Sequence, residues 1–109
     1  MSGEQLLEMT EVPDAGRIRL RLCGELDLAS APAVTERLRA LSERREQVLL
    51  DVDELTFIDM SGMRMMVMAA EDAARDGWSL AITRGSGPVR RLIELVQLDG
   101  QLPLDGSSR

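Results

Sequence analysis

Basic and aliphatic side chains alternate strictly over residues 17–22. This period of two predicts a β-strand over residues 17–23 with a buried leucine side and a wet arginine side. Residues 6–12 form a second apolar segment, and residues 13–16 between the two contain the Pro and Gly typical of a turn. The pattern therefore predicts an antiparallel hairpin whose core lies on the leucine side.

Three later segments have apolar residues at helical spacing. Ser30 followed by Pro32 predicts the N-cap and first turn of a helix that continues to about Glu46. A second helix is expected over residues 63–75, and a third begins at residues 86–88. The predicted buried stripes contain Val34, Leu38 and Leu41 in the first helix, Met63, Met66, Val67, Ala70 and Ala74 in the second, and Val89, Leu92, Ile93 and Val96 in the third.

The remaining strands complete a mixed sheet. Residues 48–50 form an unbroken apolar run before Asp51, which predicts a central strand covered on both faces. Residues 78–82 predict another strand, and residues 101–104 a short edge strand. A hairpin followed by strand and helix alternation predicts an α/β fold with a mixed four- to five-stranded sheet, parallel after the hairpin, and helices mainly on the leucine face. Residues 1–105 are expected to form one domain, and residues 106–109 a disordered tail.

Charge and composition exclude several classes of function. The formal net charge is −6 and no basic stripe is present, so nothing favours nucleic-acid binding. The longest apolar run, residues 65–70, is too short to span a membrane, and we expect a cytoplasmic protein. Cys23 is the only cysteine and His is absent, so we expect no disulfide, no soft metal site and no cofactor. Cys23 itself is expected to be a small buried residue.

Ser61 lies where a loop is expected to meet the second helix. The first amides of a helix lack intrahelical acceptors, and the helix dipole places partial positive charge there, so such a site favours an anion such as a phosphate. Position alone favours an ordinary N-cap serine, because such caps are far more common than phosphorylation sites. Both interpretations stay open at this point.

Three motifs change this weighting: Gly-Glu-Leu-Asp at residues 24–27, Ser-Ala at residues 30–31 and Phe-Ile-Asp-Met-Ser-Gly-Met at residues 57–63. In this order they resemble the STAS family, specifically the bacterial anti-sigma factor antagonists. The resemblance implies a non-enzymatic partner protein. It would bind an anti-sigma factor with a histidine-kinase-like ATPase fold, be phosphorylated by that serine kinase, and be restored by a serine phosphatase. The phosphoacceptor precedes the motif glycine, which here makes it Ser61.

The same resemblance implies partner contacts around Ser61. Asp27 matches an acidic family position near the phosphoacceptor, although an Asx turn also explains it. Asp59 either orients the acceptor or binds backbone amides in the turn. Gly62 can serve close partner approach, the turn, or both. The expected partner-binding residues are Asp27, Asp59, Met60, Gly62, Met63 and Arg64.

Two of these residues depart from the family pattern. Met60 stands where Ser or Thr is usual, which leaves Ser61 as the only hydroxyl of its loop. Arg64 stands where a small residue is common, and it either pairs with a phosphate or a partner carboxylate or is a solvated helix arginine. Met65 and Met68 fall off the predicted buried stripe and are candidates for an adaptable contact surface, although core packing against the sheet is the favoured explanation for most of the methionines between Met60 and Met68.

Two alternative functions remain. The second hypothesis, after the phospho-switched antagonist, is a non-switched STAS subunit of a stress-signalling or lipid-transport complex, in which Ser61 only caps the helix. A serine hydrolase is the weakest alternative, because the chain lacks both a His general base and a Gly-x-Ser-x-Gly motif.

Overall fold

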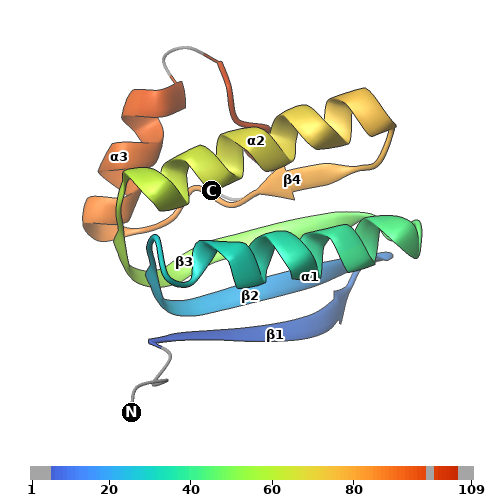
Figure 1. Cartoon of the computed structure of the whole chain (residues 1–109), viewed down its shortest axis with the longest axis horizontal. Helices are drawn as coiled ribbons and strands as arrows, with labels where there is room; N and C mark the ends of the chain where they lie inside the picture. Colours follow the sequence, from blue (N-terminus) through green and yellow to red (C-terminus); the bar gives the residue numbers. More distant parts are fainter. Residues whose placement is uncertain (1–5, 98–99, 106–109) are drawn as a thin grey trace.

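The computed structural model describes residues 6–97 and 100–105, arranged as strands with helices packed against them (Figure 1). The order of elements is that of an α/β protein after an initial hairpin. The elements are β1 (Leu7–Asp14), β2 (Arg17–Leu26), α1 (Ala31–Glu43), β3 (Val48–Ile58), α2 (Met60–Asp76), β4 (Leu80–Ile82) and α3 (Gly87–Gln97). The expected tail at residues 106–109 lies outside the described residues.

The four strands form one mixed sheet in the order β1-β2-β3-β4. β1 pairs with β2 in antiparallel fashion, whereas the β2 to β3 and β3 to β4 pairings are parallel. Leu20 of β2 is in register with Leu50 of β3, which is in register with Ile82 of β4. The predicted mixed sheet is confirmed, while the edge strand expected at residues 101–104 is reduced to a single parallel bridge between Ile82 and Leu104.

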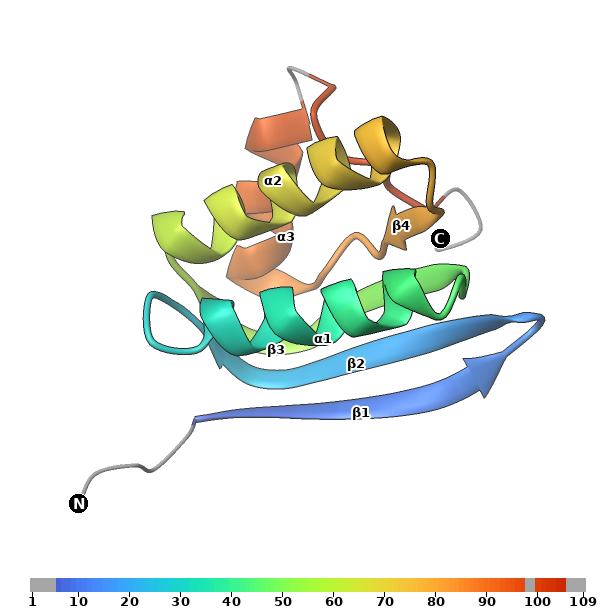
Figure 2. The same cartoon turned by 45° about the vertical axis from the view of Figure 1, so that its right-hand side comes forward.

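Both longer helices cover the leucine face of the sheet. α1 and α2 lie beside each other on that face, and α3 lies near the first turns of α2 at the end of the sheet where β3 finishes (Figures 1 and 2). Their buried side chains join the sheet residues Leu20, Leu22, Leu50, Val52 and Ile82 in one core. The helices pack on this face because its wide apolar surface must be removed from water.

Several boundaries differ from the sequence-based expectation. α1 ends at Glu43, because Arg45 adopts a left-handed φ of 61° that stops the helix. β3 runs unbroken through residues 48–58, since it pairs with β2 along its length through two irregularities in the register. α2 begins at Met60, three residues earlier than predicted, and β4 begins at Leu80 rather than Trp78.

The arginine face of the sheet is more closely packed than strand alternation predicts. Arg19 donates to the buried Asp51 at 2.7 Å and to Asp14 at 2.8 Å. These hydrogen bonds, to Asp51 first and Asp14 next, raise the pKa of the Arg19 guanidinium above its ordinary value. The prediction of a buried Cys23 is wrong: Cys23 is exposed, because its odd position on β2 places it on the arginine side of the strand.

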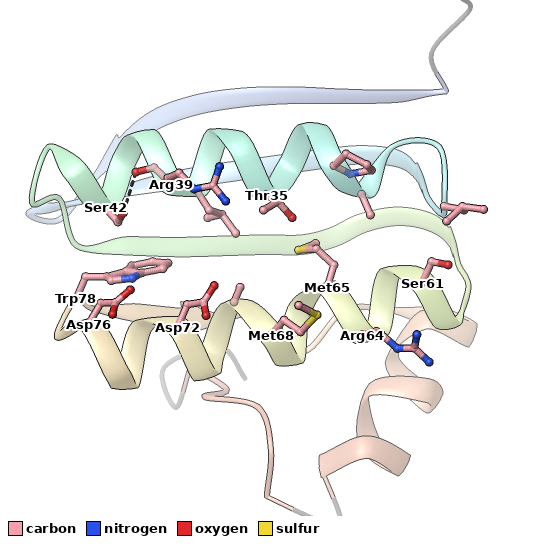
Figure 3. Close-up of a pocket in the computed structure, with 15 residues that line it drawn as sticks. Thr35, Arg39, Ser42, Ser61, Arg64, Met65, Met68, Asp72, Asp76 and Trp78 are labelled. Carbon is pink, nitrogen blue, oxygen red and sulfur yellow. Dashed lines mark hydrogen bonds between the residues drawn. The ribbon is translucent and has the colours of Figure 1, made fainter.

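Core packing explains Met65 but not Met68. Met65 is buried, whereas Met68 is 54% exposed. Since α1 lies alongside α2, the covered face of α2 is wider than the stripe that faces the sheet, and Met65 lies within it, pointing toward α1 (Figure 3). Only Met68 of this pair stays available as a surface methionine.

Candidate functional site

The two acidic motif residues follow paired strand ends. Leu26 of β2 and Ile58 of β3 are in register, so Asp27 and Asp59 leave the sheet at the same edge. The Asp59 amide donates to the Leu26 carbonyl at 3.2 Å, which ties the two loops together. Segments separated by about thirty residues in the sequence therefore form one surface, at the carboxyl ends of parallel strands where α/β proteins place their sites.

Asp59 is the N-cap of α2. Its backbone is extended, with φ −111° and ψ −174°, and its Oδ1 accepts from the Gly62 amide at 3.0 Å. The interpretation of Asp59 as a residue that binds backbone amides is confirmed. The alternative of Ser61 as the cap is wrong, because Ser61 is already the second residue of the helix.

An Asp59→Ala substitution is expected to lower the free energy of unfolding by about 1 kcal/mol, the usual cost of losing a helix cap. Asp59→Asn keeps an oxygen in the same place and is expected to retain most of that stability. Urea denaturation of the three proteins measures the difference. Equal losses in both variants would show that the carboxylate charge, and not the cap, stabilises the helix.

Ser61 is half-buried and its hydroxyl makes no hydrogen bond within the described part of the chain. The Met60 and Ser61 amides likewise donate to no acceptor among residues 6–97 and 100–105. Together with the dipole of the 17-residue helix α2, these free donors form an environment that favours a negative charge on the Ser61 oxygen. The start of α2 therefore has the general features that favour an anion.

Gly62 allows α2 to rest on the strand ends. A Cβ at this position would lie 2.7 Å from the Leu26 carbonyl oxygen and 2.8 Å from Cγ1 of Ile58. Gly62 and Met63 are both buried. Direct partner contact by these two residues does not fit the free protein, because their side-chain positions face the core. These two residues instead support the surface residues around them from inside the fold.

The loop after β2 is held by Asp27. Its Oδ1 accepts from the Ala29 amide at 3.0 Å and the Ser30 amide at 3.1 Å, which confirms the Asx turn. Ser30 occupies the N-cap position of α1, but it makes no side-chain cap. Its hydroxyl instead donates to the Glu25 carbonyl at 2.9 Å, so the role predicted for Ser30 is wrong in this detail.

Three exposed apolar side chains surround these loops, and we call Leu28, Phe57 and Met60 the apolar rim. Leu28 is 74% exposed, Met60 70% and Phe57 47%. Sequence reasoning identified Met60 but missed Leu28 and Phe57. The available indication was a large apolar residue within two positions of each of Asp27 and Asp59. Exposed apolar area next to a polar site is typical of a protein interface.

Arg64 is exposed and forms no ion pair within the described part of the chain. Figure 3 shows its guanidinium on the side of α2 away from α1, whereas Ser61 lies on the side that faces α1. In this conformation Arg64 does not face Ser61, so its position fits contact with a partner better than contact with a phosphate on Ser61.

The described residues contain no group of three or more His, Cys, Asp or Glu side chains arranged to hold a metal ion. No helix in residues 6–97 and 100–105 is both long and apolar enough to cross a bilayer.

Comparison with known proteins gives consistent matches. The family model described as Mlab, STAS domain matches residues 9–104. The anti-sigma-B factor antagonist of Bacillus subtilis (strain 168) is 24% identical over 91 residues, or 84% of each chain.

Among solved structures, an anti-sigma factor antagonist from Mycobacterium paratuberculosis superposes with a TM-score of 0.77 at 22% identity, covering 92% of this chain and 86% of the other. The anti-sigma factor antagonist SpoIIAA in its unphosphorylated form gives a TM-score of 0.64 at 15% identity, with 92% and 88% covered. The phosphorylated form of SpoIIAA from Bacillus gives a TM-score of 0.64 at 14% identity, with 88% and 87% covered. At these identities the structures show a shared fold.

Proposed function

The chain belongs to the STAS domain family, and from this premise we propose that it is an anti-sigma factor antagonist inactivated by phosphorylation of Ser61. The anti-sigma factor partner follows from the names of the relatives. The phosphorylation switch is supported by the environment of Ser61 in this chain.

The observation that supports the switch most strongly is the free Ser61 hydroxyl beside two unpaired amides. Asp59 already provides the cap of α2, so Ser61 is not needed to begin the helix. The Ser61 hydroxyl makes no hydrogen bond within the described residues, and it lies at the start of a long helix, directly before Gly62, which close packing requires. These features suit a site of modification better than a structural role.

Phosphorylation would change the surface from apolar to strongly charged. A phosphate adds about −1.5 to −2 charges at neutral pH. It would stand next to Met60 of the apolar rim in the sequence and two residues after Asp59, on a surface that a partner must approach closely. Repulsion and the cost of desolvating the phosphate would then release the partner with no change of fold.

The proposed partner is an anti-sigma factor with a histidine-kinase-like ATPase fold that phosphorylates Ser61, and a serine phosphatase would remove the group. The chain itself would act by binding and not by catalysis, in the cytoplasm with the transcription machinery. The half-buried carboxylates of Asp27 and Asp59 suit a kinase surface with basic residues, because opposite charges speed association.

Release of the sigma factor tests this function. The unphosphorylated chain, added to a preformed complex of the anti-sigma factor with its sigma factor, is expected to displace the sigma factor on gel filtration. A Met60→Glu variant places a charge in the apolar rim and is expected to displace it at least tenfold less effectively. Continued co-elution of the sigma factor with its anti-sigma factor at excess wild-type chain would refute the proposal.

A second candidate is a non-switched STAS subunit of a larger assembly, such as a lipid-transport complex. The description of the matching family model as Mlab, with no mention of a sigma factor, is the observation that favours it. Co-purification with a transporter ATPase, without any kinase-like ATPase, would support this candidate over the first.

A further inference from the structure

A groove of about 430 Å³ lies between α1 and α2. Ser61 stands at one end and Trp78 at the other, with Met65 and Arg39 between them (Figure 3). The floor and walls of the groove are mostly apolar. The function proposed above gives this groove no role. The apolar lining residues are Leu28, Ala31, Pro32, Leu38, Met65, Met68, Ala69 and Trp78.

The groove extends along most of α2. Ser61 and Asp76 both line it, and the rise of α2 between them is about 20 Å at 1.5 Å per residue. A flexible alkyl chain can lie along the apolar lining over this length.

The groove lining contains two arginines, Arg39 and Arg64, that make no ion pair within the described residues, and Figure 3 shows the Arg64 guanidinium on the side of α2 away from α1. Asp72 and Asp76 are both bonded to Arg75, at 2.8 Å and 3.2 Å. Arg39 on the α1 wall is exposed and makes no ion pair within the described residues. Arg39 is among the residues that line the groove and is labelled on α1 in Figure 3, and its backbone carbonyl accepts a hydrogen bond from the Ser42 hydroxyl at 2.7 Å.

We propose that this groove binds an amphipathic anion with a single alkyl chain, such as a medium-chain carboxylate. The carboxylate pairs with Arg39, and the chain runs over Met65 and Met68 toward Ser61. The rise of α1 from Ala31 to Arg39 gives about 12 Å of apolar wall for that chain. Methionine side chains suit such a ligand, because they adapt to flexible apolar groups.

Occupancy has a consequence for Ser61, and this step rests on the proposed function. The end of the alkyl chain lies beside the Ser61 side chain, where it shields the hydroxyl from a kinase. A phosphate on Ser61 in turn places charge beside the apolar end of the ligand and is expected to weaken its binding.

Binding can be measured without any kinase. Trp78 is the only Trp, the chain has no Tyr, and Trp78 lines the groove, so intrinsic fluorescence reports on occupancy. Titration of the full chain with sodium dodecanoate, below its micelle concentration, is expected to give a saturable change. Sodium butanoate and dodecyltrimethylammonium are expected to give none in the same range, since one lacks the chain and the other has the opposite charge.

Two variants locate the ligand. Arg39→Gln is expected to weaken dodecanoate binding about tenfold, the effect of losing one charged hydrogen bond at a partly exposed site. Met68→Glu places a like charge on the apolar wall and is expected to abolish binding, without loss of fold because Met68 is half-exposed. Arg91→Gln makes the same charge change on α3, outside the groove lining, and is expected to bind as the wild type does.

The proposal is overturned if dodecanoate gives no saturable change, if Arg39→Gln and Arg91→Gln bind equally, or if the trimethylammonium compound binds as well as the carboxylate. None of these results depends on phosphorylation. These measurements can therefore refute ligand binding in the groove without bearing on the proposed phosphorylation of Ser61.

Discussion

A Ser61→Asp substitution is expected to weaken binding to the anti-sigma factor by about 30-fold to 100-fold, which corresponds to about 2 to 3 kcal/mol. The aspartate places a permanent negative charge beside the apolar rim and the carboxylates of Asp27 and Asp59. The fold is expected to remain intact, because an acidic residue in the first turn of a helix is stabilising. Isothermal titration calorimetry against the purified anti-sigma factor measures the effect.

Two controls separate the charge from other causes. Ser61→Ala removes the hydroxyl without adding charge and is expected to bind as the wild type does. Ser79→Asp makes the same change at an exposed residue beyond the other end of α2 and is expected to leave affinity unchanged. Equal weakening by the Ser61 and Ser79 variants would show that only net charge matters and would remove Ser61 from the interface.

A Gly24→Ala substitution is expected to lower the free energy of unfolding by about 3 kcal/mol or more, the upper range for a single residue. Gly24 has a φ of +118°, and a Cβ there would lie 2.0 Å from the Leu6 carbonyl oxygen. That oxygen accepts from the Glu25 amide at 2.9 Å, so relief of the clash also breaks a hydrogen bond at the strand end. Chemical denaturation followed by circular dichroism measures the loss.

Gly16→Ala is the matched control. Gly16 also has a positive φ, of +85°, but a Cβ there would meet nothing within 4 Å. Only the backbone strain of about 1 kcal/mol applies at this turn. An equal loss in the free energy of unfolding for both variants would show that the close approach of Leu6 to Gly24 makes no contribution to it.

The hairpin and the buried leucine face could be predicted from sequence because both depend on local periodicity. Alternation along β2 defines its two faces, and the sheet places Leu20 and Leu22 in the core as expected. The length of β3 could not be predicted in this way. Asp51 interrupts the apolar run, and its burial depends on Arg19, a residue 32 positions earlier.

The site shows the same division between local and tertiary information. The motif at residues 57–63 identifies Ser61, but Asp59 and Ser61 are both good cap residues and lie two positions apart. Their roles depend on how α2 packs on Leu26 and Ile58, which only the structure shows. Exposure of Leu28 and Phe57, and the groove that α1 forms with α2, likewise depend on tertiary packing.

Mass spectrometry of the chain after incubation with its anti-sigma kinase and Mg-ATP tests the central claim most directly. We predict a mass increase of one phosphate, mapped to Ser61 by fragmentation, and no increase in the Ser61→Ala variant. Unmodified wild-type protein under conditions in which the kinase is active, or a phosphate retained by Ser61→Ala, would contradict the phosphorylation switch at Ser61.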